Sequence, residues 1–152
     1  MIEPMRREDL DDVAALEAMV SNPAWSRAMF ESELTTNQFA VFLVARVLDA
    51  AGAPALCGYI GFWIVFDELH LLNVAVHPAW QRQGIAGRLV QAAFDRANAG
   101  GALRALLEVR ASNEAAQRLY ARFGFQLIAR RAGYYTNPTE DALIMGCEMR
   151  AD

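Results

Sequence analysis

The sequence predicts an α/β (α+β) fold, with one mixed, mostly antiparallel sheet of about seven strands flanked by four helices. Two observations support this prediction. Runs rich in Val, Phe and Leu alternate with stretches of helical periodicity, in the order strand, two helices, three strands, helix, strand, helix and two strands. The 152 residues, 55% apolar and 21% charged, also suit a single hydrophobic core. We therefore expect one domain over residues 1–152, with helices on both faces of its sheet.

The first half of the chain contains the patterns of four strands and two helices. We expect strands at residues 2–5, 39–48, 56–66 and 69–76, and helices at about 10–20 and 26–34. Asp9 is placed to cap the first helix, and Asn22-Pro23 to end it. Residues 49–54 form a predicted hairpin loop. Gly58 and Gly61, inside the strand that follows, indicate a bulge or a close approach of another backbone.

The second half contains the patterns of two helices and three strands. We expect helices at about 84–98 and 112–123, and strands at 103–109, 125–130 and 143–149. Gly100-Gly101 closes the first of these helices, Ser112-Asn113 caps the second, and Gly124 follows its end. Tyr134-Tyr135 falls in the predicted loop between the last two strands.

The stretch from Leu71 to Gly87 predicts a site for a phosphate-bearing cofactor. An apolar run stops at His77-Pro78, a polar loop follows, and an amphipathic helical pattern begins at Ile85. The first N–H groups of such a helix have no partner within the helix and carry partial positive charge. Because Gly84 has no side chain, an anion such as a pyrophosphate can approach the backbone closely, and Arg82 adds a full charge.

Three phosphate-binding patterns can be compared with this loop. A Walker A loop needs Lys and then Ser or Thr after its last glycine, whereas Gly87 is followed by Arg88. A dinucleotide fingerprint needs three glycines at fixed offsets, of which only Gly84 fits. The remaining match is the pattern Arg/Gln-x-x-Gly-x-Gly/Ala, which Gln81 to Ala86 satisfies. An ordinary strand-to-helix turn is the alternative interpretation.

Glu108 is a carboxylate at the end of an otherwise apolar predicted strand. Burial there raises its pKa towards the working range of a general base. The alternative is a solvated side chain beside Arg110. Because a helix connects strands 69–76 and 103–109, we expect these strands to be parallel, with their carboxyl ends at the same edge of the sheet.

Tyr120 and Asn113 are seven residues apart and share one face of the predicted fourth helix. That face presents an amide and a phenol to one ligand. Alternatively, Tyr120 packs in the core beside Ala116 and Phe123 with its hydroxyl at the surface. Trp25, in the loop between the first two helices, is favoured as a core residue over a substrate contact.

Taken together, several segments resemble the GNAT superfamily of acetyl-CoA-dependent N-acetyltransferases. Within it they are most similar to the RimI-type enzymes, which acetylate the N-terminal alanine of a small-subunit ribosomal protein. The similar segments are Gln81 to Ala86, Leu107 to Asn113, Arg118 to Tyr120, Phe123 to Phe125, 130–135 and 140–145. They cover the carboxy-terminal half closely, while the first sixty residues fit the GNAT plan in outline. The joint match of two motifs in the right order is far more specific than either motif alone.

The resemblance implies a role for each matching residue. Glu108 is implied as the general base and Tyr120 as the general acid of direct transfer from acetyl-CoA. The implied cofactor-binding residues are Val74, Ala75, Val76, Arg82, Gln83, Gly84, Ile85, Ala86, Gly87 and Asn113. Ala86 takes the place of the more usual second glycine, which the pattern allows. Trp25 and the tyrosines Tyr134 and Tyr135 are assigned to the acceptor groove.

The predicted function is therefore transfer of an acetyl group from acetyl-CoA to the N-terminal α-amine of a protein, with a ribosomal protein as the expected acceptor. Transfer to a small amine, such as a polyamine or an aminoglycoside, shares every cofactor feature and differs only in the groove. A non-catalytic acetyl-CoA-binding module is a third interpretation, and the retention of both Glu108 and Tyr120 counts against it.

Composition argues against several other classes of protein. A net charge of −4 is unsuited to a nucleic-acid-binding surface. Cys57 and Cys147 lie in apolar runs and are expected to be reduced core residues, and His70 and His77 lack companion metal ligands. No apolar run reaches membrane-spanning length, and the amino terminus has no signal-peptide pattern. We therefore expect a soluble, cytoplasmic, monomeric protein that binds no metal.

Overall fold

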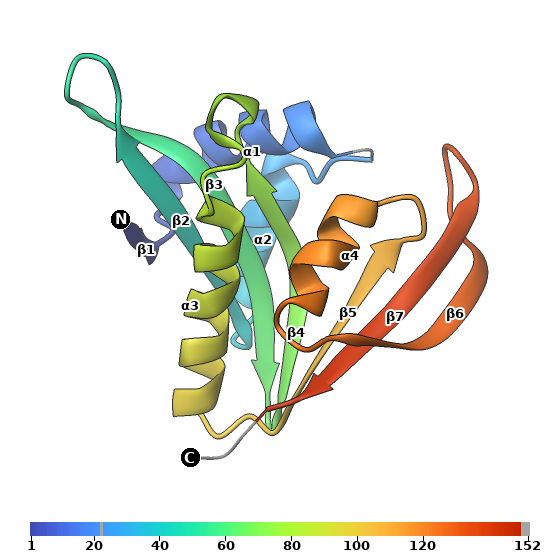
Figure 1. Ribbon diagram of the computed structural model, residues 1–152. Coiled ribbons are helices and arrows are strands. Elements are labelled where there is room, and N and C mark those ends of the chain that lie inside the picture. Colours follow the sequence, from blue (N-terminus) through green and yellow to red (C-terminus); the bar gives the residue numbers. More distant parts are fainter. Residues whose placement is uncertain (22, 150–152) are drawn as a thin grey trace. The chain divides into compact units, whose positions relative to one another are not determined.

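The computed structural model describes residues 1–21 and 23–149. Its helices and strands follow one another in the predicted order, with two short 3-10 turns added (Figure 1). The elements are β1 (Ile2–Pro4), η1 (Arg7–Asp9), α1 (Leu10–Val20), α2 (Arg27–Thr36), β2 (Ala40–Leu48), β3 (Pro54–Val65), β4 (Glu68–Val76), η2 (Pro78–Trp80), α3 (Ile85–Ala99), β5 (Arg104–Arg110), α4 (Glu114–Ala121), β6 (Gln126–Tyr135) and β7 (Glu140–Glu148). Helix α1 ends at Val20, and Asn22, expected to help end it, lies outside the described residues.

The strands form one sheet in the order β1-β2-β3-β4-β5-β7-β6. The pairs β1/β2, β5/β7 and β7/β6 are antiparallel. Strands β4 and β5 are parallel, with Glu68–Leu71 paired to Arg104–Leu107. A parallel pair needs a long crossover, which α3 supplies. The predicted mixed, mostly antiparallel sheet with four helices is therefore confirmed.

The described chain falls into two compact units. The first contains Met1–Phe62 and Asn73–Ala93, and the second contains Trp63–Leu72 and the chain from Phe94 onwards. Each unit has its own apolar packing.

The core of the first unit lies between α1, α2 and the strands. Its buried apolar residues are Met5, Leu10, Val13, Leu16, Phe30, Phe42, Val44, Tyr59 and Ala75. Trp25 is half-buried and packs against this core, with its ring centroid 5.3 Å from that of Phe30 and 6.3 Å from that of Phe42. This packing agrees with the predicted core role of Trp25.

Strand β3 carries helices on both of its faces. A Cβ added to Gly58 would lie 2.9 Å from the Ala75 carbonyl oxygen and 3.3 Å from the side chain of Leu89 on α3. The next residue, Tyr59, points the opposite way, into the α1–α2 core. A Cβ on Gly61 would collide with the ring of Phe42. Both glycines therefore mark close approaches, as predicted, and the helices cover both faces here (Figure 1).

Asp9 does not cap α1 as predicted, because its carboxylate is used elsewhere. Its two oxygens accept hydrogen bonds from the backbone N–H of Arg6, at 2.9 Å, and from the guanidinium of Arg46, at 2.7 Å. The short turn η1 precedes α1 and moves Asp9 out of the geometry of a side-chain cap. The Arg46 pairing is a long-range contact that spacing along the chain does not reveal.

A second buried carboxylate, Glu17 on α1, organises the polar interior of the first unit. The side chain is 1% exposed. One oxygen accepts from the Ser21 hydroxyl at 2.8 Å and the Tyr59 hydroxyl at 2.7 Å, and the other from the Trp25 backbone N–H at 3.0 Å and the Asn73 amide at 3.4 Å. Burial and the negative charge of Glu17 raise the pKa of Tyr59. The network joins α1, the segment before α2, β3 and β4.

Replacement of Glu17 by Gln is expected to lower the free energy of unfolding by about 1–3 kcal/mol, because the amide leaves a buried donor without its acceptor. Urea denaturation measures the change. Glu8→Gln, at an exposed site nearby, is the control, with an expected change within about 0.5 kcal/mol. Equal effects of the two substitutions would contradict a structural role for the Glu17 network.

Several element ends in the second unit differ from the sequence prediction. Helix α4 ends at Ala121, and Gly124 follows with a φ of +93°, a conformation suited to glycine after a helix. Strand β6 runs through Tyr135, so the two tyrosines predicted to lie in a loop belong to a strand, and the turn covers residues 136–139. Pairing between Tyr135 and Glu140 extends the hairpin beyond what composition indicates.

Candidate functional site

The predicted phosphate loop joins β4 to α3 in the first unit (Figure 1). After β4 ends at Val76, the chain makes the short turn η2 and enters α3 at Ile85. The first helical hydrogen bond runs from the Arg88 N–H to the Gly84 carbonyl oxygen, at 3.1 Å. The N–H groups before Arg88 are therefore the ones an α-helix leaves unpaired at its start. The helix has fifteen residues and begins with an exposed loop.

Backbone conformation gives this loop an open shape. Gly84 has a φ of +77° and Arg82 a φ of +65°. A Cβ added to Gly84 or to Gly87 would meet no atom within 4 Å, so the space above both is clear. The Gln81 side chain donates to the Val76 carbonyl oxygen at 3.1 Å and ties the loop to the end of β4. These features fit the predicted approach of an anion to the backbone.

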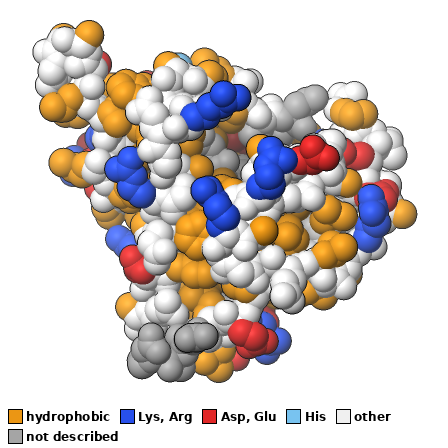
Figure 2. All heavy atoms as spheres, viewed as in Figure 1, with side chains coloured by type: hydrophobic (Ala, Val, Ile, Leu, Met, Phe, Trp, Pro, Cys, Tyr) orange, Lys and Arg blue, Asp and Glu red, His pale blue; other side chains and the backbone are white. Residues whose placement is uncertain are grey.

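The charge around the loop is positive, although the protein as a whole is acidic. Arg82 is exposed, and Arg88 donates from its guanidinium to the Gln83 carbonyl oxygen at 3.2 Å. Figure 2 shows arginine side chains dispersed among apolar and acidic groups on the face that it displays.

Gly84→Ala is expected to raise the KM for the predicted phosphate-bearing cofactor, which the resemblance implies to be acetyl-CoA, about tenfold, because holding an L-residue at a left-handed φ in the binding conformation costs about 1–2 kcal/mol. Gly52→Ala is the matched control. It has a φ of +81° and equally open surroundings, but lies in the β2–β3 hairpin. Steady-state kinetics should show the rise for Gly84→Ala only. A similar KM for both variants would exclude a role of the loop in cofactor binding.

Glu108 lies on β5 in the second unit and is exposed, with 40% of its side chain accessible. Burial alternates along β5, so Leu107 and Val109 point inward while Glu108 points outward. Of the two alternatives that the sequence left open for Glu108, a buried and a solvated carboxylate, the structure shows the solvated one. The sequence does not show this alternation, because the residues on both sides of Glu108 are apolar whether they point inward or outward. The guanidinium of Arg131 lies 3.8 Å from the Glu108 carboxylate.

Tyr120 is 8% exposed, and its ring packs against Phe125 with centroids 5.7 Å apart. Burial, followed by the neighbouring Tyr135, raises the pKa of Tyr120 to about 12. Within residues 1–21 and 23–149 the Tyr120 hydroxyl has no hydrogen-bond partner. The phenol therefore keeps its proton at neutral pH and has it available for a ligand.

Asn113 precedes α4 and caps it. Its side-chain oxygen accepts from the Ala116 backbone N–H at 3.1 Å, as the predicted cap requires. Ser112, predicted as the other half of that cap, instead donates its hydroxyl to Glu140 at 3.0 Å. Asn113 is the residue immediately before α4, so it caps the helix from outside instead of lying within it as expected.

Tyr134 and Tyr135 end β6, with ring centroids 5.1 Å apart in an edge-to-face arrangement. The guanidinium of Arg110 lies 4.4 Å from the centroid of Tyr135, and that of Arg131 lies 5.1 Å from the centroid of Tyr134. Burial, and then the charge of Glu108, raise the pKa of Tyr135. Within the second unit, Tyr135 therefore interacts electrostatically with Glu108 and with Tyr120.

The sequence profile of the Acetyltransferase (GNAT) family matches residues 9–125. The chain belongs to this family. As a GNAT protein, it is an acetyl-CoA-dependent N-acetyltransferase of the RimI type, as its motifs predict.

Two curated relatives resemble the chain over almost its whole length. A candidate ribosomal protein bS18-alanine N-acetyltransferase of Bacillus subtilis is 39% identical over 144 residues, which are 95% of this chain and 92% of the relative. The ribosomal protein bS18-alanine N-acetyltransferase of Haemophilus ducreyi is 35% identical over 150 residues, covering 95% and 97%.

Solved structures of GNAT proteins have the same fold as this chain. The ribosomal-protein-S18-alanine N-acetyltransferase from Escherichia coli superposes with a TM-score of 0.84 at 30% identity, over 98% of this chain and 93% of that one. Arabidopsis thaliana NAA60 in complex with acetyl-CoA superposes with a TM-score of 0.85 at 18% identity, covering 98% of both chains, and supports the fold alone.

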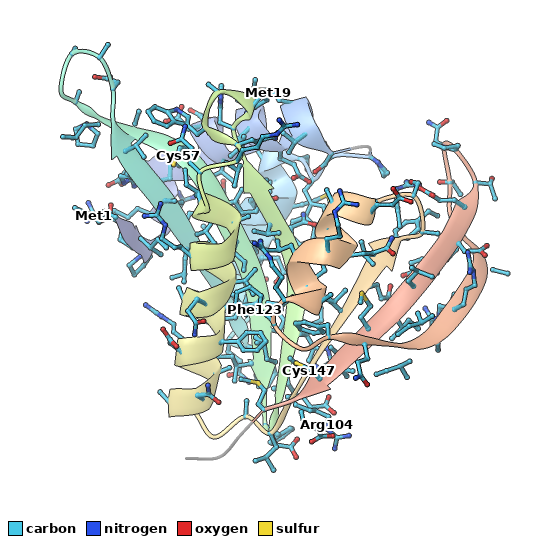
Figure 3. All side chains as sticks on the ribbon, viewed as in Figure 1. Met1, Met19, Cys57, Arg104, Phe123 and Cys147 are labelled. Carbon is cyan, nitrogen blue, oxygen red and sulfur yellow. The ribbon has the colours of Figure 1, made fainter. Side chains whose placement is uncertain are left out.

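Three further predictions concern cysteines, membranes and metals. Cys57 on β3 and Cys147 on β7 are both free thiols, and burial raises the pKa of each, that of Cys147 to about 11 (Figure 3). Cys57 is buried, as expected, but Cys147 is only partly so. None of the helices in the described part of the chain is both long and apolar enough to span a bilayer. Across the same residues no cluster of three metal-ligating side chains is found.

Proposed function

We propose that this enzyme acetylates the N-terminal α-amine of a protein, and that its acceptor is the N-terminal alanine of ribosomal protein bS18. The observation that carries this proposal is identity of 39% and 35%, over at least 92% of each relative, to proteins named for that reaction. Similarity of this extent covers 95% of this chain, including the segments outside the cofactor motif.

In this proposal, the loop of the first unit holds the acetyl donor. Backbone N–H groups of Arg82 to Gly87 bind the pyrophosphate of acetyl-CoA, and the backbone of Val74 to Val76 pairs with the pantetheine arm. The helix start, the positive φ at Gly84 and the two nearby arginines support the first assignment. Asn113 is proposed to contact the cofactor through its amide nitrogen, because its oxygen caps α4.

Chemistry is assigned to two residues of the second unit. The amine attacks the carbonyl carbon of the thioester, the C–N bond forms and the C–S bond breaks. An ammonium acceptor loses two protons in becoming an amide. One leaves through Glu108 to solvent, and the other balances the proton that the CoA sulfur gains. The exposure of Glu108 suits transfer through water.

Tyr120 is proposed as the general acid. Its pKa of about 12 lies above that of an ordinary thiol, about 8.5, so it assists mainly by hydrogen-bonding to the sulfur while the C–S bond breaks. The buried ring fixes the position of the hydroxyl, and the hydroxyl has no competing partner among the described residues.

An α-amine suits this base better than a lysine side chain does. The pKa of an α-amine is near 8 and that of lysine near 10.4, a difference worth roughly 3.3 kcal/mol in the free energy of deprotonation. An exposed carboxylate such as Glu108 therefore deprotonates the α-ammonium of a chain terminus more readily than the ammonium of a lysine side chain. Tyr134 and Tyr135 are proposed to contact the acceptor peptide, whereas the packing of Trp25 favours its core role.

The deciding experiment incubates the enzyme and acetyl-CoA with N-terminal peptides, including one that begins with the bS18 sequence, and measures CoA release. Matched peptides with a blocked terminus, and a polyamine and an aminoglycoside, are run in parallel. The sequence contains no lysine, so acetylation of the enzyme's own side-chain amines cannot contribute to the signal. Preference for the bS18 peptide supports the proposal. Turnover of the small amines alone would replace it with the small-amine function.

A further inference from the structure

Arg110, the last residue of β5, has a side chain that is only 18% exposed and that none of the roles assigned above uses. Its Nη1 donates to Glu140 Oε1 at 2.9 Å and to the Pro138 carbonyl oxygen at 3.3 Å. Its Nη2 donates to the Thr136 carbonyl oxygen at 3.1 Å. One planar guanidinium therefore binds the β6–β7 turn at two carbonyls and the first residue of β7.

The same guanidinium also contacts Tyr135, the last residue of β6. It lies 4.4 Å from the centroid of the ring, within the range of a cation–π interaction. The phenol of Tyr135 lies in the field of both Glu108, which raises its pKa, and Arg110, which lowers it. Tyr135 in turn contributes to the raised pKa of Tyr120. Arg110 thus holds the aromatic residue that interacts with both proposed catalytic groups.

Glu140 completes the arrangement on the opposite side of Arg110. Its carboxylate is 17% exposed and accepts from the Ser112 backbone N–H at 3.2 Å and from the Ser112 hydroxyl at 3.0 Å. The hydrogen bond from Arg110, followed by that from the Ser112 hydroxyl, lowers the pKa of Glu140. Glu140 therefore joins the start of β7 both to the end of β5, through Arg110, and to the loop that leads into α4, through Ser112.

Neighbouring ion pairs of the hairpin are built differently. Arg130 pairs with Asp141 at 2.6 Å, but the Arg130 side chain is 58% exposed. An exposed pair contributes little and is screened by salt. The enclosed Arg110–Glu140 pair, with its carbonyl and aromatic partners, is instead a fixed structural contact.

We propose that Arg110 is a positioning residue for the acceptor, which holds Tyr135 and the turn 136–139 in the arrangement that receives the peptide terminus. This inference rests on the proposed function. An arginine is needed because its planar group donates to several oxygens and stacks on a ring at once, which a lysine ammonium does not do.

The test compares Arg110→Met and Arg110→Lys with Arg130→Met, the matched arginine on β6 that also pairs with an acid at the start of β7. For Arg110→Met the peptide KM is expected to rise about tenfold with the KM for acetyl-CoA nearly unchanged, and for Arg110→Lys it should rise by an intermediate amount. Arg130→Met should resemble the wild type. A peptide KM of Arg110→Met within about twofold of wild type, or an equal rise in both KM values, overturns the proposal.

Hydrogen exchange of residues 135–140, measured by mass spectrometry, tests the contact without turnover. Faster exchange is expected in Arg110→Met and not in Arg130→Met, and unchanged exchange in Arg110→Met overturns the positioning role. If Arg110→Met does not fold, Glu140→Gln carries both measurements, because it removes the charge and keeps the shape. A wild-type enzyme that transfers to no peptide refutes the proposed function, while the exchange result still decides whether Arg110 holds the turn.

Discussion

Tyr120→Phe is expected to lower kcat about a hundredfold while the KM for acetyl-CoA stays within about twofold. The substitution removes only the hydroxyl that is proposed to assist departure of the CoA sulfur. Phenylalanine retains the ring that packs on Phe125. Since the hydroxyl has no hydrogen-bond partner among the described residues, its loss should not lower the thermal midpoint. Steady-state kinetics and thermal unfolding of the same preparation measure the two effects.

The control for Tyr120→Phe is Tyr59→Phe, which removes a buried hydroxyl that donates to Glu17 at 2.7 Å. That variant should lose stability and keep kcat near the wild-type value, the reverse of Tyr120→Phe. The pH dependence adds a second check. Because the pKa of Tyr120 is raised to about 12, its ionisation should cause no fall in kcat below about pH 11. Full activity of Tyr120→Phe would remove this residue from the mechanism.

Glu108→Gln is expected to lower kcat/KM for the peptide about a hundredfold at pH 6.5, with the deficit shrinking to about tenfold or less at pH 9. At pH 6.5 an α-amine with a pKa near 8 is mostly protonated and needs a base, whereas at pH 9 it is mostly neutral. The exposed Glu108–Arg131 pair at 3.8 Å contributes less than about 1 kcal/mol, so stability should change little.

Glu114→Gln, an exposed carboxylate in the first turn of α4, is the matched control and should follow the wild type at both pH values. Peptide kinetics from pH 6 to pH 9 provide the comparison. A deficit of Glu108→Gln that stays the same across this range would show that Glu108 does not remove the first proton of the ammonium. An equal fall in kcat/KM for Glu114→Gln would show that the loss in Glu108→Gln comes from the change in surface charge.

The sequence by itself determined the order of elements, the parallel pair around α3 and the family. These features follow from patterns that act locally, namely the apolar runs, the helical periodicity and the loop from Gln81 to Gly87. Local backbone requirements, such as the positive φ at Gly84 and Gly124 and the Asn113 cap, are also encoded in short stretches. A few neighbouring residues decide each of them.

Only the tertiary structure decided which polar side chains are buried and which residues they pair with. Asp9 meets Arg46, Glu17 meets Tyr59, and Arg110 meets Glu140, across separations of 37, 42 and 30 residues. Glu108 is exposed although it lies in an apolar stretch, because strand pleating sets the direction of its side chain, and Tyr120 is buried although arginines lie two residues before and after it. Desolvation and charge pairing depend on distances in space between side chains, and these distances cannot be read from the spacing of residues along the chain.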